Sequence, residues 1–156
     1  MFNGIIFNKG IVNKIKKSTK GVNIFVKSNL KVKKKDLGVS ICCDGVCLTM
    51  VSFKNKVMEF YLLKETMDRS KFKNVSIGDK INLELPLKYG QKISGHLCQG
   101  HVDCTSKVNK IIKKGKSRIY DFTIDKNNLS YLIPKASILL NGVSLTISKG
   151  TKHRFQ

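Results

Sequence analysis

A seven-residue motif occurs twice in this chain of 156 residues, and it constrains the fold more than any other feature. Residues 43–49 read Cys-Asp-Gly-Val-Cys-Leu-Thr, and residues 140–146 read Leu-Asn-Gly-Val-Ser-Leu-Thr. Asp-Gly and Asn-Gly between apolar runs predict a tight β-hairpin, because both central residues of that turn need a positive φ. Packing alone would preserve the apolar residues and the turn, but it would not require Cys or Ser followed by Leu-Thr in both copies. The motif therefore predicts two related hairpins, with a nucleophilic or hydrogen-bonding side chain at Cys47 and Ser144.

The repeat extends beyond the hairpins. Val12-Asn13-Lys14 recurs as Val108-Asn109-Lys110, and Gly4 aligns with Gly100. A repeat on this scale predicts two similar units, each large enough for a small β-barrel when complete.

The two units are expected to cover residues 1–93 and residues 94–156. The chain ends at Gln156, which aligns with Glu59 of the first copy. The second copy then lacks counterparts of residues 60–85, so we expect its barrel to be incomplete and truncated.

Alternating apolar residues and turn signals predict six strands in the first copy. Short connections between them favour a closed antiparallel barrel, because an open sheet of this size would leave two long edges. One short helix is expected at residues 64–70 and a basic connector with a half-turn of helix at residues 30–35. The expected strands are residues 4–15, 22–27, 39–43, 46–53, 57–63 and 80–85.

The chain carries 30 Lys and Arg against 10 Asp and Glu, a net charge of +20. Only three of the basic residues are Arg, and the Lys residues are spread over nearly every segment, whereas nucleic-acid surfaces usually concentrate charge and favour Arg. The aromatic fraction of 8%, without Trp, shows no clustered rings for stacking single strands. We therefore assign most of the charge to solvated faces, with nonspecific attraction to polyanions and no specific nucleic-acid partner.

Five cysteines are an odd number, and two of them are adjacent. This arrangement does not suit a disulfide framework, so we expect reduced thiols and a cytoplasmic location. The N-terminus lacks the pattern of a signal peptide, and no apolar run is long enough to span a membrane.

Residues 94–104 hold His96, Cys98, His101 and Cys104, which raises the possibility of zinc. The spacing is loose for a structural zinc site. In a strand, the side chains of His96 and Cys98 would point to one face and that of His101 to the other. We favour polar groups in a cleft, where neighbouring glycines let the backbone approach a ligand closely. Two surface histidines in a linker remain the alternative.

Taken together, these motifs closely resemble riboflavin synthase of the alpha-subunit type. The match runs in order over the whole chain, and five motifs collinear with an internal repeat are highly specific. The matching segments are residues 1–6, 44–49, 64–66 and 95–103, Lys135, and residues 141–146.

The resemblance implies two tandem six-stranded antiparallel Greek-key barrels, the second incomplete, in an all-β protein. It implies the dismutation of two molecules of 6,7-dimethyl-8-ribityllumazine to riboflavin and 5-amino-6-ribitylaminouracil, without a metal or an organic cofactor. The family assembles as a homotrimer, in which the N-barrel of one subunit meets the C-barrel of its neighbour. A non-catalytic protein that binds lumazine or flavin in one site is the alternative within the same fold.

The resemblance also implies roles for individual residues. Ser144 or Cys47 would supply or position a nucleophile, and His96 and His101 would carry protons or anchor the ligand, since imidazole exchanges protons near neutral pH. The expected substrate-binding residues are Gly4, Ile5, Ile6, Cys47, Leu48, Thr49, Tyr61, Leu62, Leu63, Lys64, Glu65, Thr66, Gly100, His101, Val102, Lys135, Ser144, Leu145 and Thr146.

The chain departs from the family pattern at two of the matched motifs. Asn3 stands where the family usually has Thr, and Asn141 stands where the second barrel usually has an acidic residue. A charge implicated in proton handling or ligand orientation is therefore absent at Asn141.

Overall fold

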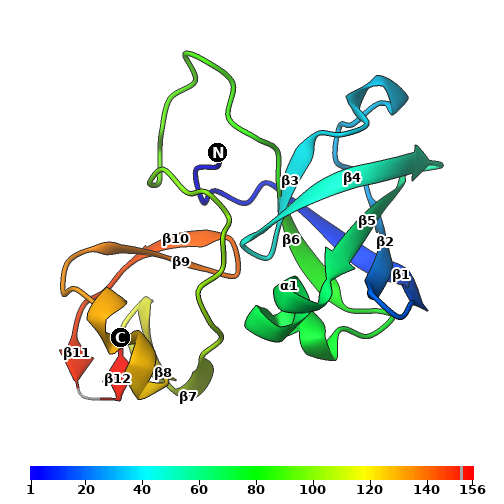
Figure 1. Cartoon of the computed structure of the whole chain (residues 1–156). Helices are drawn as coiled ribbons and strands as arrows, with labels where there is room; N and C mark the ends of the chain where they lie inside the picture. The colour runs from blue at the N-terminus through cyan, green and yellow to red at the C-terminus, as the bar shows by residue number, and fades with distance from the viewer. Residues whose placement is uncertain (152) are drawn as a thin grey trace. The chain divides into compact units, whose positions relative to one another are not determined.

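The computed structural model describes residues 1–151 and 153–156. The first copy of the repeat forms a closed antiparallel barrel, with strand order β1-β2-β5-β4-β3-β6 (Figure 1). This confirms the expected fold class and the six strands of the first barrel. The strands are β1 (Asn8–Lys17), β2 (Gly21–Ser28), β3 (Ser40–Cys43), β4 (Val46–Lys54), β5 (Val57–Leu63) and β6 (Lys80–Glu84).

Short helices connect some of these strands. The helix α1 (Lys64–Arg69) follows β5 directly and is succeeded by the 3-10 turn η2 (Lys71–Asn74). Another 3-10 turn, η1 (Lys34–Asp36), lies within the connector between β2 and β3. The predicted helix and the predicted half-turn are both confirmed, to within a few residues at their ends.

The first strand begins later than the sequence pattern suggests. Residues 4–15 alternate loosely, but β1 starts at Asn8. Residues 2–4 do not extend β1, because Phe2 forms an isolated antiparallel bridge with Cys98. This use of the N-terminal residues organises the functional site described below.

The interior of the barrel is apolar. Inward-facing side chains along the strands alternate with solvent-facing ones, as the period of a β-strand requires. Burying each large side chain contributes about 1.5–3 kcal/mol, so these residues dominate the stability of the barrel. Phe72 of η2 joins these strand residues in the core, and the largest of the strand side chains include Phe60, Ile24, Ile41, Met50, Met58, Leu62, Ile81 and Leu83.

The repeated Val-Asn-Lys tripeptide has a structural cause. The register between β1 and β2 shifts between Val12 and Lys14, which marks a β-bulge at Asn13. The equivalent register, between Val108 and Lys110, shifts in the same way. A bulge increases local twist and helps a strand to bend around a barrel, so the tripeptide marks the same bend in both copies.

The second copy forms smaller sheets. One has the strand order β11-β12-β8-β7, and the other pairs β9 with β10. Phe122 and Phe155 stack in the first of these, with ring centroids 4.9 Å apart. The elements are β7 (Lys107–Lys114), β8 (Ser117–Thr123), the 3-10 turn η3 (Lys126–Tyr131), β9 (Ser137–Leu140), β10 (Val143–Thr146), β11 (Gly150–Thr151) and β12 (Arg154–Phe155).

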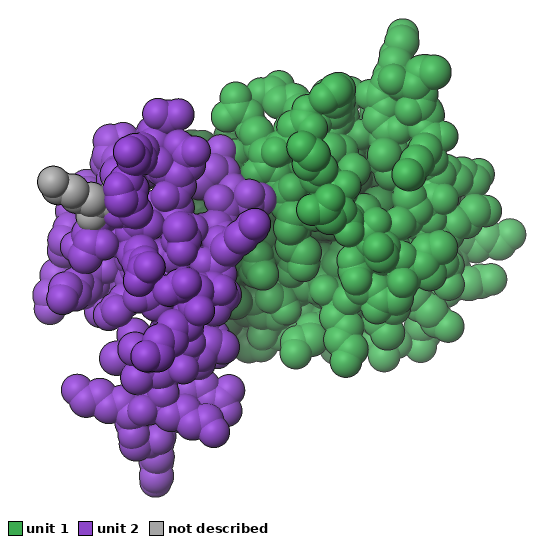
Figure 2. Space-filling model, turned by 90° about the horizontal axis from the view of Figure 1, so that it is seen from below, with its two compact units in different colours: residues 1–102, 139–144 green, residues 103–138, 145–156 purple. Residues whose placement is uncertain are grey.

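The chain divides into two compact units, coloured separately in Figure 2. The barrel unit comprises residues 1–102 and 139–144, and the second unit comprises residues 103–138 and 145–156. The tip of the second hairpin thus belongs to the barrel unit. The division of the repeat between residues 93 and 94 remains a prediction about the two sequence copies.

None of the helices within residues 1–151 and 153–156 is long and apolar enough to cross a membrane.

Replacing a buried and an exposed phenylalanine by alanine should have very different effects on the free energy of unfolding. Phe60 is fully buried and Phe7 is 84% exposed. We expect Phe60→Ala to lower the free energy of unfolding by about 3–5 kcal/mol, because it removes buried surface and leaves a cavity. Phe7→Ala should change it by less than about 0.5 kcal/mol. Urea denaturation of both variants measures the difference, and equal losses would contradict this assignment of the core.

Candidate functional site

The two repeated turns lie against each other within the barrel unit. Asp44 and Gly45 have φ values of 47° and 90°, and Asn141 and Gly142 have 48° and 80°. These signs confirm the tight turns expected from the Asp-Gly and Asn-Gly pairs. A Cβ atom on Gly45 would lie 3.1 Å from the nitrogen of Gly142, and the reverse contact is the same length. Glycine is therefore required at both turns by backbone conformation and by the close approach.

Backbone hydrogen bonds cross between the two copies in equivalent pairs. The amide of Ser144 donates to the carbonyl of Gly4 at 2.8 Å, and the amide of Cys47 donates to the carbonyl of Gly100 at 2.8 Å. Each repeated hairpin is thus bonded to the first residues of the other copy. The two pairs are related by an approximate two-fold symmetry. We call the backbone around Gly4 and Ser144 the Ser144 cradle, and the backbone around Cys47 and Gly100 the Cys47 cradle.

A third pair of residues, one from each copy, is also joined by backbone hydrogen bonds. Phe2 and Cys98 exchange two backbone hydrogen bonds, of 2.8 and 2.9 Å. Both side chains are buried in a small apolar cluster with Cys42, against which Cys47 and Leu139 also pack. Through Cys47 and Leu139, this cluster contacts residues of both repeated hairpins.

The cradles differ in their side chains. In the Ser144 cradle, Nδ1 of His96 lies 2.7 Å from Oγ of Ser144, and the direction of this hydrogen bond depends on the imidazole tautomer. In the Cys47 cradle the equivalent position carries a half-buried thiol. The structure therefore brings together Ser144 and His96, two of the four residues expected to be catalytic.

A buried carboxylate holds the N-terminal residues in place. Glu84, at the end of β6, accepts hydrogen bonds from the amides of Asn3 at 2.8 Å and Gly4 at 3.0 Å. Asn3 in turn accepts from the amide of Gly95 through its side-chain oxygen and from the amide of His96 through its carbonyl. Sequence reasoning missed Glu84, since a single acidic residue at a strand end carries no signal of its own.

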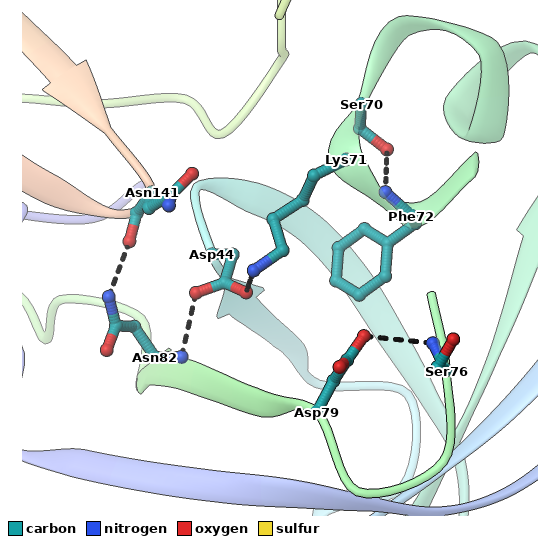
Figure 3. A network of polar contacts seen from close by, with 8 residues as sticks. All are labelled: Asp44, Ser70, Lys71, Phe72, Ser76, Asp79, Asn82 and Asn141. Carbon is teal, nitrogen blue, oxygen red and sulfur yellow. Dashed lines mark hydrogen bonds and ion pairs between the residues drawn. The ribbon is translucent and has the colours of Figure 1, made fainter. Parts of the chain in front are cut away.

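A second polar network braces the repeated turns (Figure 3). Oδ1 of Asp44 accepts a hydrogen bond from the amide of Asn82 at 2.8 Å, and Nζ of Lys71 lies 2.8 Å from Oδ2. The Asn82 side chain also donates to the carbonyl of Asn141 at 2.9 Å. Asn82 therefore links the turn of the first hairpin to the turn of the second. The acidic residue at the first turn acts here through ion pairing and turn bracing.

The thiols near the site are held in the protonated form. Burial raises the pKa of Cys42 to about 12 and raises the pKa of Cys43 well above its usual range. Burial, together with the charge of Glu84, also raises the pKa of Cys98. All five cysteines are free. Buried protonated thiols are poor nucleophiles, so these three serve as packing groups.

Most of the remaining candidates in the barrel unit occupy the rims of the cradles. Ile5 and Ile6 are half-buried, and Ile6 approaches Gly142. Val102 packs against the barrel core, and His101 is exposed beside Gly100. Leu48 is buried within the barrel core, so only its backbone can face a ligand, whereas Thr49 is exposed.

The segment from Tyr61 to Thr66 has structural contacts of its own. Leu62 is fully buried in the core, while Tyr61 and Leu63 are exposed. Lys64 pairs with Asp68 at 2.5 Å and Glu65 pairs with Arg69 at 3.2 Å, both one helical turn apart on α1. The carbonyl of Thr66 accepts a hydrogen bond from Ser70. Among the described residues, no hydrogen bond or ion pair joins this segment to Ser144 or His96.

Three expected binding residues belong to the second compact unit. Lys135 is exposed and has a φ of 71°, and its amide donates to the carbonyl of Ile147. Leu145 and Thr146 follow Ser144 and are also exposed. Their roles in binding remain predictions.

Within the described part of the chain, no group of three or more His, Cys, Asp and Glu side chains is arranged to hold a metal ion. His96 is directed to Ser144, and the thiol of Cys98 donates to the carbonyl of His96 at 3.0 Å.

Comparisons with known proteins agree with this architecture. The family model of the lumazine binding domain matches residues 3–86 and 99–156, one segment for each copy of the repeat. Riboflavin synthase from Bacillus subtilis is 32% identical over 147 residues, which cover 94% of this chain and 68% of the relative. Riboflavin synthase from Brucella abortus is 31% identical over 160 residues, which cover 99% of this chain and 79% of the relative. The crystal structure of LumP complexed with riboflavin superimposes with a TM-score of 0.84 at 22% identity, covering 99% of this chain and 84% of that one.

The family match covers most of the chain, and riboflavin synthases more than 30% identical align along most of their length. The chain therefore belongs to the lumazine-binding domain family that includes the riboflavin synthases.

The buried thiol of Cys42 should make the protein sensitive to alkali. Its pKa rises from 9.0 in the unfolded chain to about 12 in the folded state, so the folded state binds this proton more tightly. Its contribution to stability is complete below pH 9 and is lost progressively as the pH rises toward 12. We expect the free energy of unfolding to fall over this interval, and Cys42→Ala to make the fall shallower. Urea titrations at pH 8, 9, 10 and 11 measure both slopes, and identical slopes would contradict the assignment.

Proposed function

We propose that this chain is a riboflavin synthase, which dismutates two molecules of 6,7-dimethyl-8-ribityllumazine. One molecule transfers a four-carbon unit to the other, giving riboflavin and 5-amino-6-ribitylaminouracil. Atoms and electrons balance between the two lumazines, so the reaction needs no external oxidant or reductant. Membership of the family and the relatives named riboflavin synthase support the proposal.

The observation that carries the proposal is the hydrogen bond between Ser144 and His96. With the proton on Nε2, the imidazole accepts at Nδ1 and Ser144 donates, an arrangement that activates a hydroxyl nucleophile. As the Ser144 oxygen adds to a ring carbon of one lumazine, its proton passes to His96 and the displaced electron pair moves onto a ring nitrogen. His96 can later return the proton when the serine oxygen leaves.

The second lumazine must lose a proton from a methyl group. The resulting carbanion is delocalised into the ring, so a modest base suffices. His101, which is exposed beside Gly100, is the candidate base that accepts this proton at the Cys47 cradle. The half-buried thiol of Cys47 is then placed to orient the ring rather than to mirror Ser144, since no imidazole is hydrogen-bonded to it in the way that His96 is bonded to Ser144 among the described residues.

In this proposal each reacting ring pairs with backbone groups of one cradle. Residues 4–6 and 144–146 would bind one pteridine, and residues 47–49 and 100–102 the other. Lumazine carries a ring of amide-like donors and acceptors, which backbone N–H and C=O groups recognise by direct pairing. Lys135 and residues 61–66 complete the proposed binding set.

A homotrimer in the cytoplasm is part of the same proposal. The trimer rests on the family resemblance and the location on five free cysteines, which suit a reducing compartment. Sedimentation analysis under assay conditions would measure the assembly.

Binding of a lumazine or flavin without turnover is the second candidate. It is supported by the structural likeness to LumP, whose crystal structures hold 6,7-dimethyl-8-ribityllumazine, flavin mononucleotide or riboflavin. The difference between the two cradles also favours it, because one intact site is sufficient for binding but not for dismutation.

A single-turnover assay separates the two candidates. The purified chain is mixed with 6,7-dimethyl-8-ribityllumazine, and riboflavin formation is followed by fluorescence together with the number of lumazines bound per chain. We expect riboflavin to form. One lumazine bound with no riboflavin would favour the binding protein, and absence of binding would overturn both candidates.

Replacement of Ser144 tests the proposed nucleophile. We expect Ser144→Ala to slow riboflavin formation by about 100-fold or more, in the range of a lost catalytic group, with little change in lumazine affinity. Ser117→Ala, on an exposed position of β8 in the second unit, is the matched control. Equal rates for the two variants would show that the hydroxyl of Ser144 takes no part in the reaction.

A further inference from the structure

The Ser144–His96 pair is assembled from two segments that do not pair with each other as strands. His96 lies in the extended segment after β6, and Ser144 lies on β10. A side-chain hydrogen bond of 2.7 Å between Nδ1 of His96 and Oγ of Ser144 joins them. A side-chain contact on its own does not fix the orientation of an imidazole to the accuracy that catalysis requires.

Residues 3 and 4 provide the missing support by bonding to both segments. The carbonyl of Asn3 accepts from the amide of His96 at 3.2 Å, and its side-chain oxygen accepts from the amide of Gly95 at 2.8 Å. The carbonyl of Gly4 accepts from the amide of Ser144 at 2.8 Å. One short stretch of chain therefore sets the position of both members of the pair.

Glu84 anchors that stretch to the barrel. Its two carboxylate oxygens accept separately from the amides of Asn3 and Gly4, at 2.8 and 3.0 Å. The residue ends β6, which pairs with β1 and β3 in the closed barrel. Glu84 and Asn3 are 8% and 5% exposed, so both sets of hydrogen bonds are shielded from competing water. Charge-assisted bonds of this kind are stronger than bonds between neutral groups.

The space around this support is tightly filled. A Cβ atom on Gly95 would lie 2.1 Å from the carbonyl oxygen of Asn3 and 2.8 Å from Cβ of Ser144. A Cβ atom on Gly4 would lie 2.7 Å from Cβ of Ser144, at a φ of +74°. Small displacements of Asn3 would therefore be transmitted to Ser144 directly.

The repeat supplies an internal comparison. Gln99 occupies the position equivalent to Asn3, immediately before Gly100. Its side chain is exposed, whereas that of Asn3 is buried. The buried polar support is thus a property of the Ser144 cradle, which is also the cradle with the histidine.

We propose that Asn3 and Glu84 are positioning residues, which hold His96 in line with Ser144 through the shared hydrogen bonds of residues 3 and 4. Neither touches the reacting atoms. The expected effect on turnover rests on the proposed function. The expected effect on the orientation of His96 rests only on the hydrogen bonds described above. Asn3 carries the support through its side-chain oxygen, and a Thr at this position would also offer an acceptor oxygen.

The kinetic test compares three variants with the wild-type chain. We expect Asn3→Ala to slow single-turnover riboflavin formation by about 10- to 100-fold, since small misplacements of catalytic groups have effects of this size. The dissociation constant for lumazine should change by less than about threefold. Asn3→Thr, which keeps an acceptor oxygen, should restore most of the rate, and Gln99→Ala should match the wild type. A loss in affinity instead of rate, or an equal loss in Gln99→Ala, would overturn the proposal.

A spectroscopic test does not depend on turnover. The ring ¹⁵N resonances of His96 report the hydrogen bond at Nδ1 and the tautomer, and they can be measured in the free protein. We expect them to move in Asn3→Ala and in Glu84→Gln and to stay unchanged in Gln99→Ala, with retained amide spectra showing that each variant folds. Unmoved resonances in a folded Asn3→Ala protein would overturn the positioning role. A wild-type chain that makes no riboflavin would reject the proposed function while leaving this test intact.

Discussion

The reciprocal hydrogen bonding between the start of each copy and the hairpin of the other is the constraint on which the site depends. Phe2 and Cys98 exchange backbone hydrogen bonds, and Gly45 and Gly142 approach so closely that a Cβ atom on either would lie 3.1 Å from the nitrogen of the other. Once these contacts form, the amides of Cys47 and Ser144 must each face the opening residues of the other copy. The two cradles follow from this exchange, and neither copy can build a cradle from its own residues alone.

The sequence was sufficient to predict the parts of the fold that depend on local conformation. The Asp-Gly and Asn-Gly turns were recognisable because positive φ restricts the residues that can occupy them. The strand β5 and the helix α1 were predicted nearly to the residue, because the change from period two to a helical segment occurs abruptly after Leu63. The repeated Val-Asn-Lys tripeptide was visible as a pattern, although its meaning as a β-bulge required the register of the strands.

The residues that support the site could not be predicted in the same way. Glu84 acts through backbone amides far away in the sequence, and nothing near it signals that partnership. Residues 4–7 look like the beginning of β1, since alternation cannot show which segment a strand pairs with. The pairing of His96 with Ser144 was likewise invisible, because the two residues were proposed separately and only the crossed hydrogen bonds bring them together.

The crossed arrangement also sets an order on synthesis. The Cys47 cradle can form as soon as residue 100 has left the ribosome. The Ser144 cradle can form only after residue 144 has been made, although its other residues, Asn3 and Gly4, are among the first to be synthesised. During that delay, Asn3 and Gly4 can already be held by Glu84, which belongs to the completed barrel. The hydrogen bonds of Glu84 therefore need no residue of the second hairpin, so one side of the later cradle can be positioned before the strand that completes it.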